Sequence, residues 1–393
     1  MVKTKFQSVY LNSCGLCAMR ILIDNAVVVT LSSDRPLIQN AYIYIDRGMV
    51  ISVSEGEPPE EYQYAEYIID GSGRVVMPGF SLGFMDPLRV LFRHVDYDEH
   101  KLVRYIEEVL SRKELDLVFE ALLASLESKG FTGVVTFART PFIARMLARA
   151  SSSAWIRTRI VLQASDEAEV VSELKKASKE VKEPDALSKA IVGFGALVGD
   201  ANLMNNLAGR YPEYHIYVRS NLLKGERVPR NIVVLGHTDE RVKKVVVDEY
   251  KEYVEGDGFG VLKRGFSTPT TIMLRLLESM SIASGDPYEV SLKALTTWNY
   301  LNSDLGIGEI REGASADLII LNFREPPSWP LIVSGARDLY KAIVEGDYVI
   351  ESVIVGGEVV VDKGENLMVG SAVIKRARPI LEELCKAVRA WVL

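Results

Sequence analysis

Segments with the pattern of buried strands alternate with helical segments along the middle of this chain. Strand patterns occur at 131–137, 159–162, 190–194, 215–219 and 232–237, and helical patterns occur at 102–128, 140–150, 166–181 and 200–210. Parallel neighbours need a long crossover, usually a helix, so this alternation predicts a parallel sheet. The number of units in 393 residues favours a TIM-like (β/α) barrel over an open sheet. We place it at 78–300, compressed on its closing side because only short strands, 244–248 and 259–262, follow residue 237.

Both ends of the chain are rich in short β segments. Two strands, 41–46 and 49–53, are joined by the turn Arg47-Gly48, and a second hairpin is expected within 348–361. We predict that 19–75 plus 303–366 form one small β-sandwich domain, split by the barrel. The remaining predicted parts are an N-terminal extension of uncertain order, 1–18, with Met19 as a second candidate start, and a C-terminal helix within 367–393.

Two phrases flank the predicted barrel. The first runs from Ile69 to Phe80 and reads I-D-G-S-G-R-V-V-M-P-G-F, and the second runs from Leu305 to Leu321 and reads L-G-I-G-E-I-R-E-G-A-S-A-D-L-I-I-L. They resemble the amidohydrolase superfamily, whose members are metal-dependent hydrolases and deaminases of non-peptide carbon–nitrogen bonds. In that family D-x-x-G-x-x-V-x-P-G-F leads into the first barrel strand, and G-x-I-x-x-G-x-x-A-D-L-x-x-L follows the barrel. The resemblance covers 19–366 and implies the barrel and the split β domain.

The resemblance also implies a metal site at the carboxyl ends of the barrel strands. Family members hold one or two divalent metals through a His-x-His pair on the first strand, a His on the fifth, a His on the sixth and an Asp on the eighth. A carboxylated Lys from the fourth strand often joins them. Such a metal lowers the pKa of its bound water to about 7, so that hydroxide can attack at neutral pH.

This chain departs from that ligand set at most positions. Phe84 and Asp86 stand in place of the first-strand pair, and Tyr217 stands at the fifth-strand position with His215 one alternation step earlier. The sixth-strand position is retained as His237, whereas Arg264 lies near the expected acidic residue. We therefore predict no bound metal and no cofactor. If the protein is active, one divalent metal such as zinc is expected, and Asp86 and His237 are the candidate catalytic residues.

The same positions predict a ligand-binding pocket. Its expected residues are Phe84, Asp86, His215, Tyr217, Arg219, His237 and Arg264. Unpaired arginines at the barrel mouth would suit a carboxylate or phosphate, whereas pairing of Arg219 and Arg264 with Asp86 or Asp239 is the structural alternative. Other structural interpretations are that the two aromatic residues fill the space the metals vacated, that Asp86 caps a turn before Pro87, and that His237 is a hydrogen-bonded core histidine.

Three functions follow as hypotheses. The first is an amidohydrolase-like protein that has lost the metal chemistry and binds a small molecule or a partner. The second is an active hydrolase of non-peptide carbon–nitrogen bonds with an altered site that uses Asp86, His215 and His237. The third is a structural subunit of an oligomer, formed with itself or with a homologous subunit.

The amino-acid composition argues against nucleic acid and membranes as binding partners. The formal net charge is −7, so no positive field favours nucleic acid or an anionic membrane. We find neither a membrane-spanning apolar run nor a signal-peptide pattern, and we predict a cytoplasmic protein without a membrane partner. Three cysteines, Cys14, Cys17 and Cys385, are too few for a disulfide framework.

Overall fold

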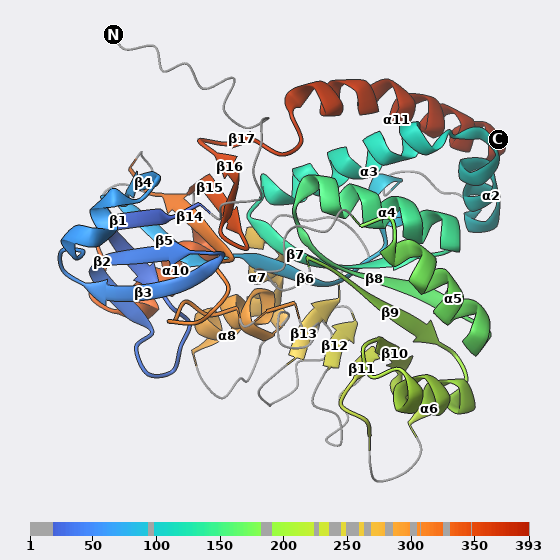
Figure 1. Ribbon diagram of the computed structural model, residues 1–393, viewed down its shortest axis with the longest axis horizontal. Helices are drawn as coiled ribbons and strands as arrows, with labels where there is room; N and C mark the ends of the chain where they lie inside the picture. Colours follow the sequence, from blue (N-terminus) through green and yellow to red (C-terminus); the bar gives the residue numbers. More distant parts are fainter. Residues whose placement is uncertain are drawn as a thin grey trace.

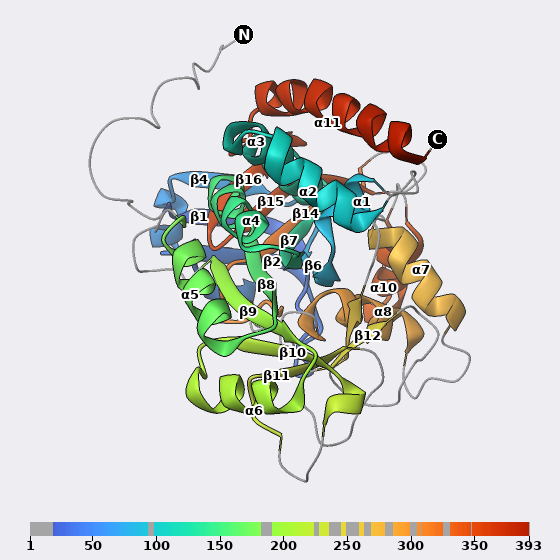
Figure 2. The same cartoon turned by 90° about the vertical axis from the view of Figure 1, so that its right-hand side faces the viewer.

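The computed structural model describes residues 19–92, 98–181, 191–223, 228–235, 245–248, 259–262, 269–279, 286–298, 305–306, 308–324, 331–346 and 348–392. Two sheets dominate the fold. Figure 1 shows an open sheet on one side of the molecule and a barrel on the other, with a long C-terminal helix lying across the top of the barrel side. The same arrangement is seen from the barrel side in Figure 2.

Eight parallel strands form a closed barrel. They are β6 (Phe80–Met85), β7 (Phe131–Ala138), β8 (Arg157–Ala164), β9 (Val192–Val198), β10 (His215–Arg219), β11 (Ile232–Leu235), β12 (Val245–Asp248) and β13 (Phe259–Leu262). The parallel sheet predicted from the alternation is therefore confirmed. The last three strands have four residues each, and β13 returns to β6 through the pair Leu262 and Phe84.

Helices lie between and after the barrel strands along the chain. They are α1 (Pro87–Leu91), α2 (Glu99–Val109), α3 (Arg112–Glu127), α4 (Pro141–Ala154), α5 (Glu167–Ser178), α6 (Ala201–Arg210), α7 (Pro269–Ser279) and α8 (Pro287–Leu295). The prediction of a single helix at 102–128 is wrong, because the helix is interrupted between α2, which ends at Val109, and α3, which begins at Arg112. Ser111 and Glu114 form a reciprocal capping box there, which satisfies the free backbone N–H groups at the start of α3.

The two ends of the chain meet in one nine-stranded sheet. Its strands are β1 (Ile21–Val29), β2 (Leu37–Asp46), β3 (Met49–Glu55), β4 (Tyr67–Asp70), β5 (Arg74–Pro78), β14 (Leu318–Asn322), β15 (Val349–Val355), β16 (Glu358–Asp362) and β17 (Glu365–Asn366). The antiparallel pairing of β14 with β5 joins the N-terminal and C-terminal strands. A sandwich of two packed sheets is not confirmed, because these strands belong to a single sheet. Helix α10 (Ala336–Glu345) and the short 3-10 turns η1 (Glu60–Tyr64) and η2 (Ser220–Leu222) complete the described elements apart from the C-terminal helix.

A buried ion pair joins the barrel to the nine-stranded sheet. Arg157, the first residue of β8, donates from Nε to both carboxylate oxygens of Asp317 at 2.8 Å. The backbone N–H of Gly356, in the turn between β15 and β16, donates to the same carboxylate at 2.8 Å. Arg157 and Asp317 are 1% and 6% exposed. The aspartate of the second sequence phrase is thus a structural link between the two sheets.

Helix α11 (Ser371–Val392) lies along α3 (Figure 1). The connection into α11 is held by Glu127, which is 0% exposed and accepts a hydrogen bond from Asn366 Nδ2 at 2.5 Å. The Oε1 atom of Glu127 has no hydrogen-bond partner in the described part of the chain. Burial raises the pKa of this carboxyl well above its usual range, and the hydrogen bond from Asn366 opposes that rise only in part.

Replacing Glu127 with glutamine is expected to stabilise the protein at high pH. The folded-state pKa is raised above the unfolded value of about 4.5, so the contribution of Glu127 is fully present below that value and is lost as pH rises toward the folded pKa. Glutamine is neutral throughout and still offers an acceptor to Asn366. Urea unfolding should therefore give a Glu127→Gln advantage of about 1–3 kcal/mol at pH 8 that shrinks toward pH 4. The exposed control Glu365→Gln should show no such trend, and a pH-independent difference at Glu127 would contradict the assignment.

No described helix is both long and apolar enough to cross a membrane.

Candidate functional site

The carboxyl ends of the barrel strands bring the predicted aromatic residues together. Phe84 of β6 and Tyr217 of β10 have ring centroids 6.2 Å apart, and Phe84 is stacked on Phe137 of β7 at 5.8 Å. Tyr217 is fully buried among Val135, Val161, Val233 and Leu305. Apolar side chains therefore occupy the barrel interior at this level, in agreement with the interpretation that the aromatic residues fill it.

Asp86 lies at the end of β6 with both carboxylate oxygens engaged. Its Oδ1 accepts from the backbone N–H groups of Leu88 and Arg89 at 3.0 and 3.3 Å, so Asp86 is the N-cap of α1. Its Oδ2 accepts from Arg139 Nη2 at 2.7 Å and lies 3.6 Å from Arg89 Nε. The capping role is the one expected from Asp86-Pro87.

The partner of Asp86 differs from the expectation. Pairing with Arg219 or Arg264 was the structural alternative, whereas the structure pairs the carboxylate with Arg139 and Arg89, and Arg264 lies outside the described residues. The physical reason is strand order: Arg139 directly follows β7, the neighbour of β6, whereas Arg219 ends β10, which pairs with β9 and β11.

Arg139 is a site residue that the sequence reasoning missed. Its guanidinium carbon lies 4.8 Å from the centre of the Phe137 ring, and its side chain is 23% exposed. This combination of ion pairing and stacking fixes the guanidinium plane at the barrel mouth. Its position in the sequence could have indicated this role, since Arg139 follows the second strand pattern as closely as Asp86 follows the first.

Two other predicted residues lie at the two ends of β10. His215 is 4% exposed and begins β10, and its carbonyl oxygen lies against Gly195 of β9, where an added Cβ would approach it to 2.6 Å. Arg219 ends the same strand and is exposed. His237, Arg264 and Asp239 lie outside the described residues, so the pairing and metal-ligand predictions for them remain predictions.

The described residues do not form the metal site that the resemblance implies. No group of three His, Cys, Asp or Glu side chains that could hold an ion occurs among them. Asp86, the replacement for a first-strand ligand, already bonds two backbone N–H groups and Arg139, and Phe84 places an aromatic ring at the other first-strand position. A divalent cation at Asp86 would have to displace a guanidinium from a carboxylate that is 5% exposed.

Sequence comparison finds partial matches to deaminases and no matching family model. A 5-methylthioadenosine/S-adenosylhomocysteine deaminase of Halalkalibacterium halodurans is 40% identical over 62 residues, which are 16% of this chain and 14% of the relative. A 5'-deoxyadenosine deaminase of Methanosarcina acetivorans is 28% identical over 145 residues, 36% of this chain and 32% of the relative. The chain thus matches about a third or less of the length of these curated relatives.

Solved structures share the fold over nearly the whole chain. A triazine hydrolase variant aligns with a TM-score of 0.73 at 13% identity and covers 93% of this chain and 99% of its own. A zinc-bound adenosine deaminase of Xanthomonas campestris aligns with a TM-score of 0.70 at 12% identity, over 93% and 98% of the two chains. The atrazine chlorohydrolase of Arthrobacter aurescens, complexed with zinc, aligns with a TM-score of 0.71 at 13% identity, over 93% and 100%.

These structures correct one prediction. The absence of any cofactor was expected from the altered ligand positions, but the zinc in these neighbours points to a divalent metal rather than none. Substitutions at a few ligand positions leave the fold intact, and that fold is shared along 93% of this chain. The deaminase matches and the common fold together place this chain in the amidohydrolase superfamily.

Proposed function

We propose that this amidohydrolase-like protein binds a small anionic molecule at the mouth of its barrel, with Arg139 as the principal contact. The observation that supports the proposal is the pair of partly exposed guanidinium groups beside Asp86. Two guanidinium groups, those of Arg139 and Arg89, lie at 2.7 and 3.6 Å from one carboxylate oxygen. The side chains of Arg139 and Arg89 are 23% and 46% exposed, so both guanidinium groups are accessible to a carboxylate or phosphate that approaches the barrel mouth.

The surroundings of Arg139 also favour a flat apolar group on that ligand. Phe137 lies beneath the guanidinium, and Phe84 is stacked on Phe137 at 5.8 Å. Phe84 is half-buried, so part of its surface remains at the mouth. Aromatic walls with a few convergent polar groups are typical of small-molecule sites. A ligand with an aromatic ring and an acidic group matches both features.

Opposite effects of two substitutions test this proposal. With benzoate and phenyl phosphate as probes, calorimetry should show saturable binding that Arg139→Gln weakens about tenfold, because a hydrogen bond to a charged group is lost. Asp86→Asn keeps an N-cap side chain but removes the competing carboxylate, so binding should tighten several-fold. Arg145→Gln, which alters an ion pair with Glu173 away from the mouth, is the control and should change nothing. Equal effects of all three variants on binding would contradict the proposal. The melting temperature of each variant shows whether a loss of binding is caused by unfolding.

A second candidate function is metal-dependent hydrolysis of a non-peptide carbon–nitrogen bond. It is supported by the deaminase names of the partial relatives and by the zinc of the structural neighbours. Because Asp86 already accepts hydrogen bonds from two backbone N–H groups and from Arg139, the metal would take its ligands from other residues. Ammonia release from 5'-deoxyadenosine or S-adenosylhomocysteine by zinc-loaded protein, lost in His237→Ala, would favour this function. Saturable anion binding without ammonia release would favour the first.

A further inference from the structure

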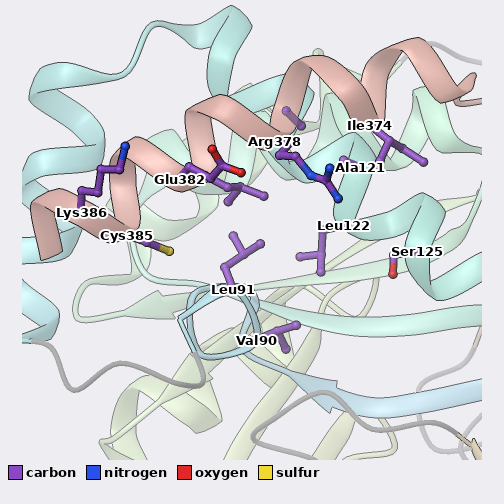
Figure 3. Close-up of a pocket in the computed structure, with 12 residues that line it drawn as sticks. Val90, Leu91, Ala121, Leu122, Ser125, Ile374, Arg378, Glu382, Cys385 and Lys386 are labelled. Carbon is purple, nitrogen blue, oxygen red and sulfur yellow. The ribbon is translucent and has the colours of Figure 1, made fainter. Parts of the chain in front are cut away.

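A cavity of about 610 Å³ lies between the C-terminal helix and the barrel helices. Figure 3 shows its walls: α11 on one side, α3 on another, and α1 at the base. Most of the lining is apolar, and Leu91, Leu122 and Leu381 contribute the larger side chains. Its volume and lining fall in the range of small-molecule sites, and it is separate from the cluster of Arg139 and Asp86.

The packing of α11 explains why the space exists. Leu384 and Val388 bury fully against the molecule and hold the helix in place, whereas the lining residues Ala377 and Ala121 on the two facing helices are small. Pro379 lies inside α11, directly after the lining residue Arg378. A proline removes one helical hydrogen bond and crowds the carbonyl group four residues earlier, which favours a bend in α11 beside the cavity.

Three charged side chains of α11 line one wall of the cavity. Arg378, Glu382 and Lys386 line it at successive i, i+4 positions of α11, and none of them forms an ion pair with another described residue. In Figure 3 the guanidinium of Arg378 extends from α11 toward Leu122. Two cations and one acid leave an excess positive charge beside an apolar surface. The complementary ligand carries one negative charge and a long apolar group.

The geometry points to a fatty-acid site: the cavity binds a medium- or long-chain carboxylate, with the acyl chain against Leu91, Leu122 and Leu381 and the carboxylate on Arg378. A guanidinium forms two parallel hydrogen bonds with a carboxylate, which an alcohol cannot reproduce. The acyl chain removes apolar lining from water, and each methylene group contributes to affinity until the cavity is filled.

The experiment is a calorimetric titration of the full chain with octanoate, decanoate and dodecanoate below their micelle concentrations. Affinity should rise about fourfold for each added methylene group. Arg378→Gln should weaken dodecanoate binding about tenfold and leave dodecanol binding unchanged. The control Arg376→Gln alters the same helix outside the cavity and should bind like the unmodified protein.

A second readout places the ligand in the cavity. Cys385 lines it and is half-buried, so bound dodecanoate should slow alkylation of that thiol, measured by peptide mass spectrometry. Non-saturable binding, equal losses in Arg378→Gln and Arg376→Gln, equal affinity for dodecylammonium, or unprotected Cys385 at saturation would each overturn the proposal. Because Arg139 is not in this cavity, Arg139→Gln should leave dodecanoate binding intact whatever its effect on aromatic anions.

Discussion

Replacing Asp317 with alanine is expected to lower the free energy of unfolding by about 3–5 kcal/mol. The substitution leaves the guanidinium of Arg157 buried at 1% exposure without its principal counter-charge. It also removes the acceptor for the backbone N–H of Gly356, which lies in the turn of the β15–β16 hairpin. Most of the cost comes from the uncompensated charge rather than from the worth of the ion pair itself, since desolvation offsets much of the attraction within a buried pair.

A double substitution separates these two contributions. Arg157→Met with Asp317→Leu removes both charges and keeps comparable volume, so it should cost less than Asp317→Ala alone. Glu167→Gln breaks an ion pair with the exposed Arg210 and should change stability by less than about 1 kcal/mol. Urea unfolding at constant pH measures all three. A loss at Asp317 no larger than that at Glu167 would show that the buried pair does not join the two sheets.

Replacing Gly79 with alanine is expected to cost about 2–4 kcal/mol. Gly79 is the glycine of the Pro-Gly-Phe phrase between β5 and β6, and an added Cβ would lie 2.0 Å from Thr132 Oγ1 and 2.3 Å from its Cγ2. Thr132 is fully buried in β7, so it cannot move aside without displacing that strand. The methyl group must therefore push apart β6 and β7, where the barrel begins.

The matched control is Gly209→Ala in α6, where nothing lies within 4 Å of the added Cβ. Alanine is the better helix former, so this variant should gain up to about 1 kcal/mol. Thr132→Ala removes the two nearest of the three Thr132 atoms that clash, and keeps Cβ at 2.7 Å, so it should recover part of the stability in a Gly79→Ala background. Thermal and urea unfolding measure the series. Equal behaviour of the Gly79 and Gly209 variants would contradict the steric account.

Short-range patterns predicted the strands and helices of this fold well. The buried runs at 131–137 and 159–162 and the short strand at 259–262 correspond to β7, β8 and β13. Each depends on local alternation and on turn residues, which are visible in sequence. The family phrases also have a physical basis here, because Gly79 accommodates Thr132 and Asp317 pairs with Arg157.

The contacts of the candidate site were less accessible from sequence. Asp86 and Arg139 are 53 positions apart, and their meeting depends on the register of β6 against β7. Glu127 and Asn366, which are 239 positions apart, depend on how α3 packs beside the β16–β17 edge. The alternation of strands and helices predicts a barrel, but no pattern within a single sequence shows which side chains from distant segments will contact each other. The roles predicted for His237 and Arg264 remain predictions.

The most direct measurement is an X-ray structure of crystals grown with zinc, with anomalous diffraction recorded at the zinc edge. The central claim is that Asp86 serves as the N-cap of α1 and the partner of Arg139, and not as a metal ligand. The predicted result is that the hydrogen bond between Asp86 and Arg139 persists, with any zinc at the barrel mouth bound to other residues. A zinc peak about 2.0–2.2 Å from an Asp86 carboxylate oxygen, with Arg139 displaced, would contradict it.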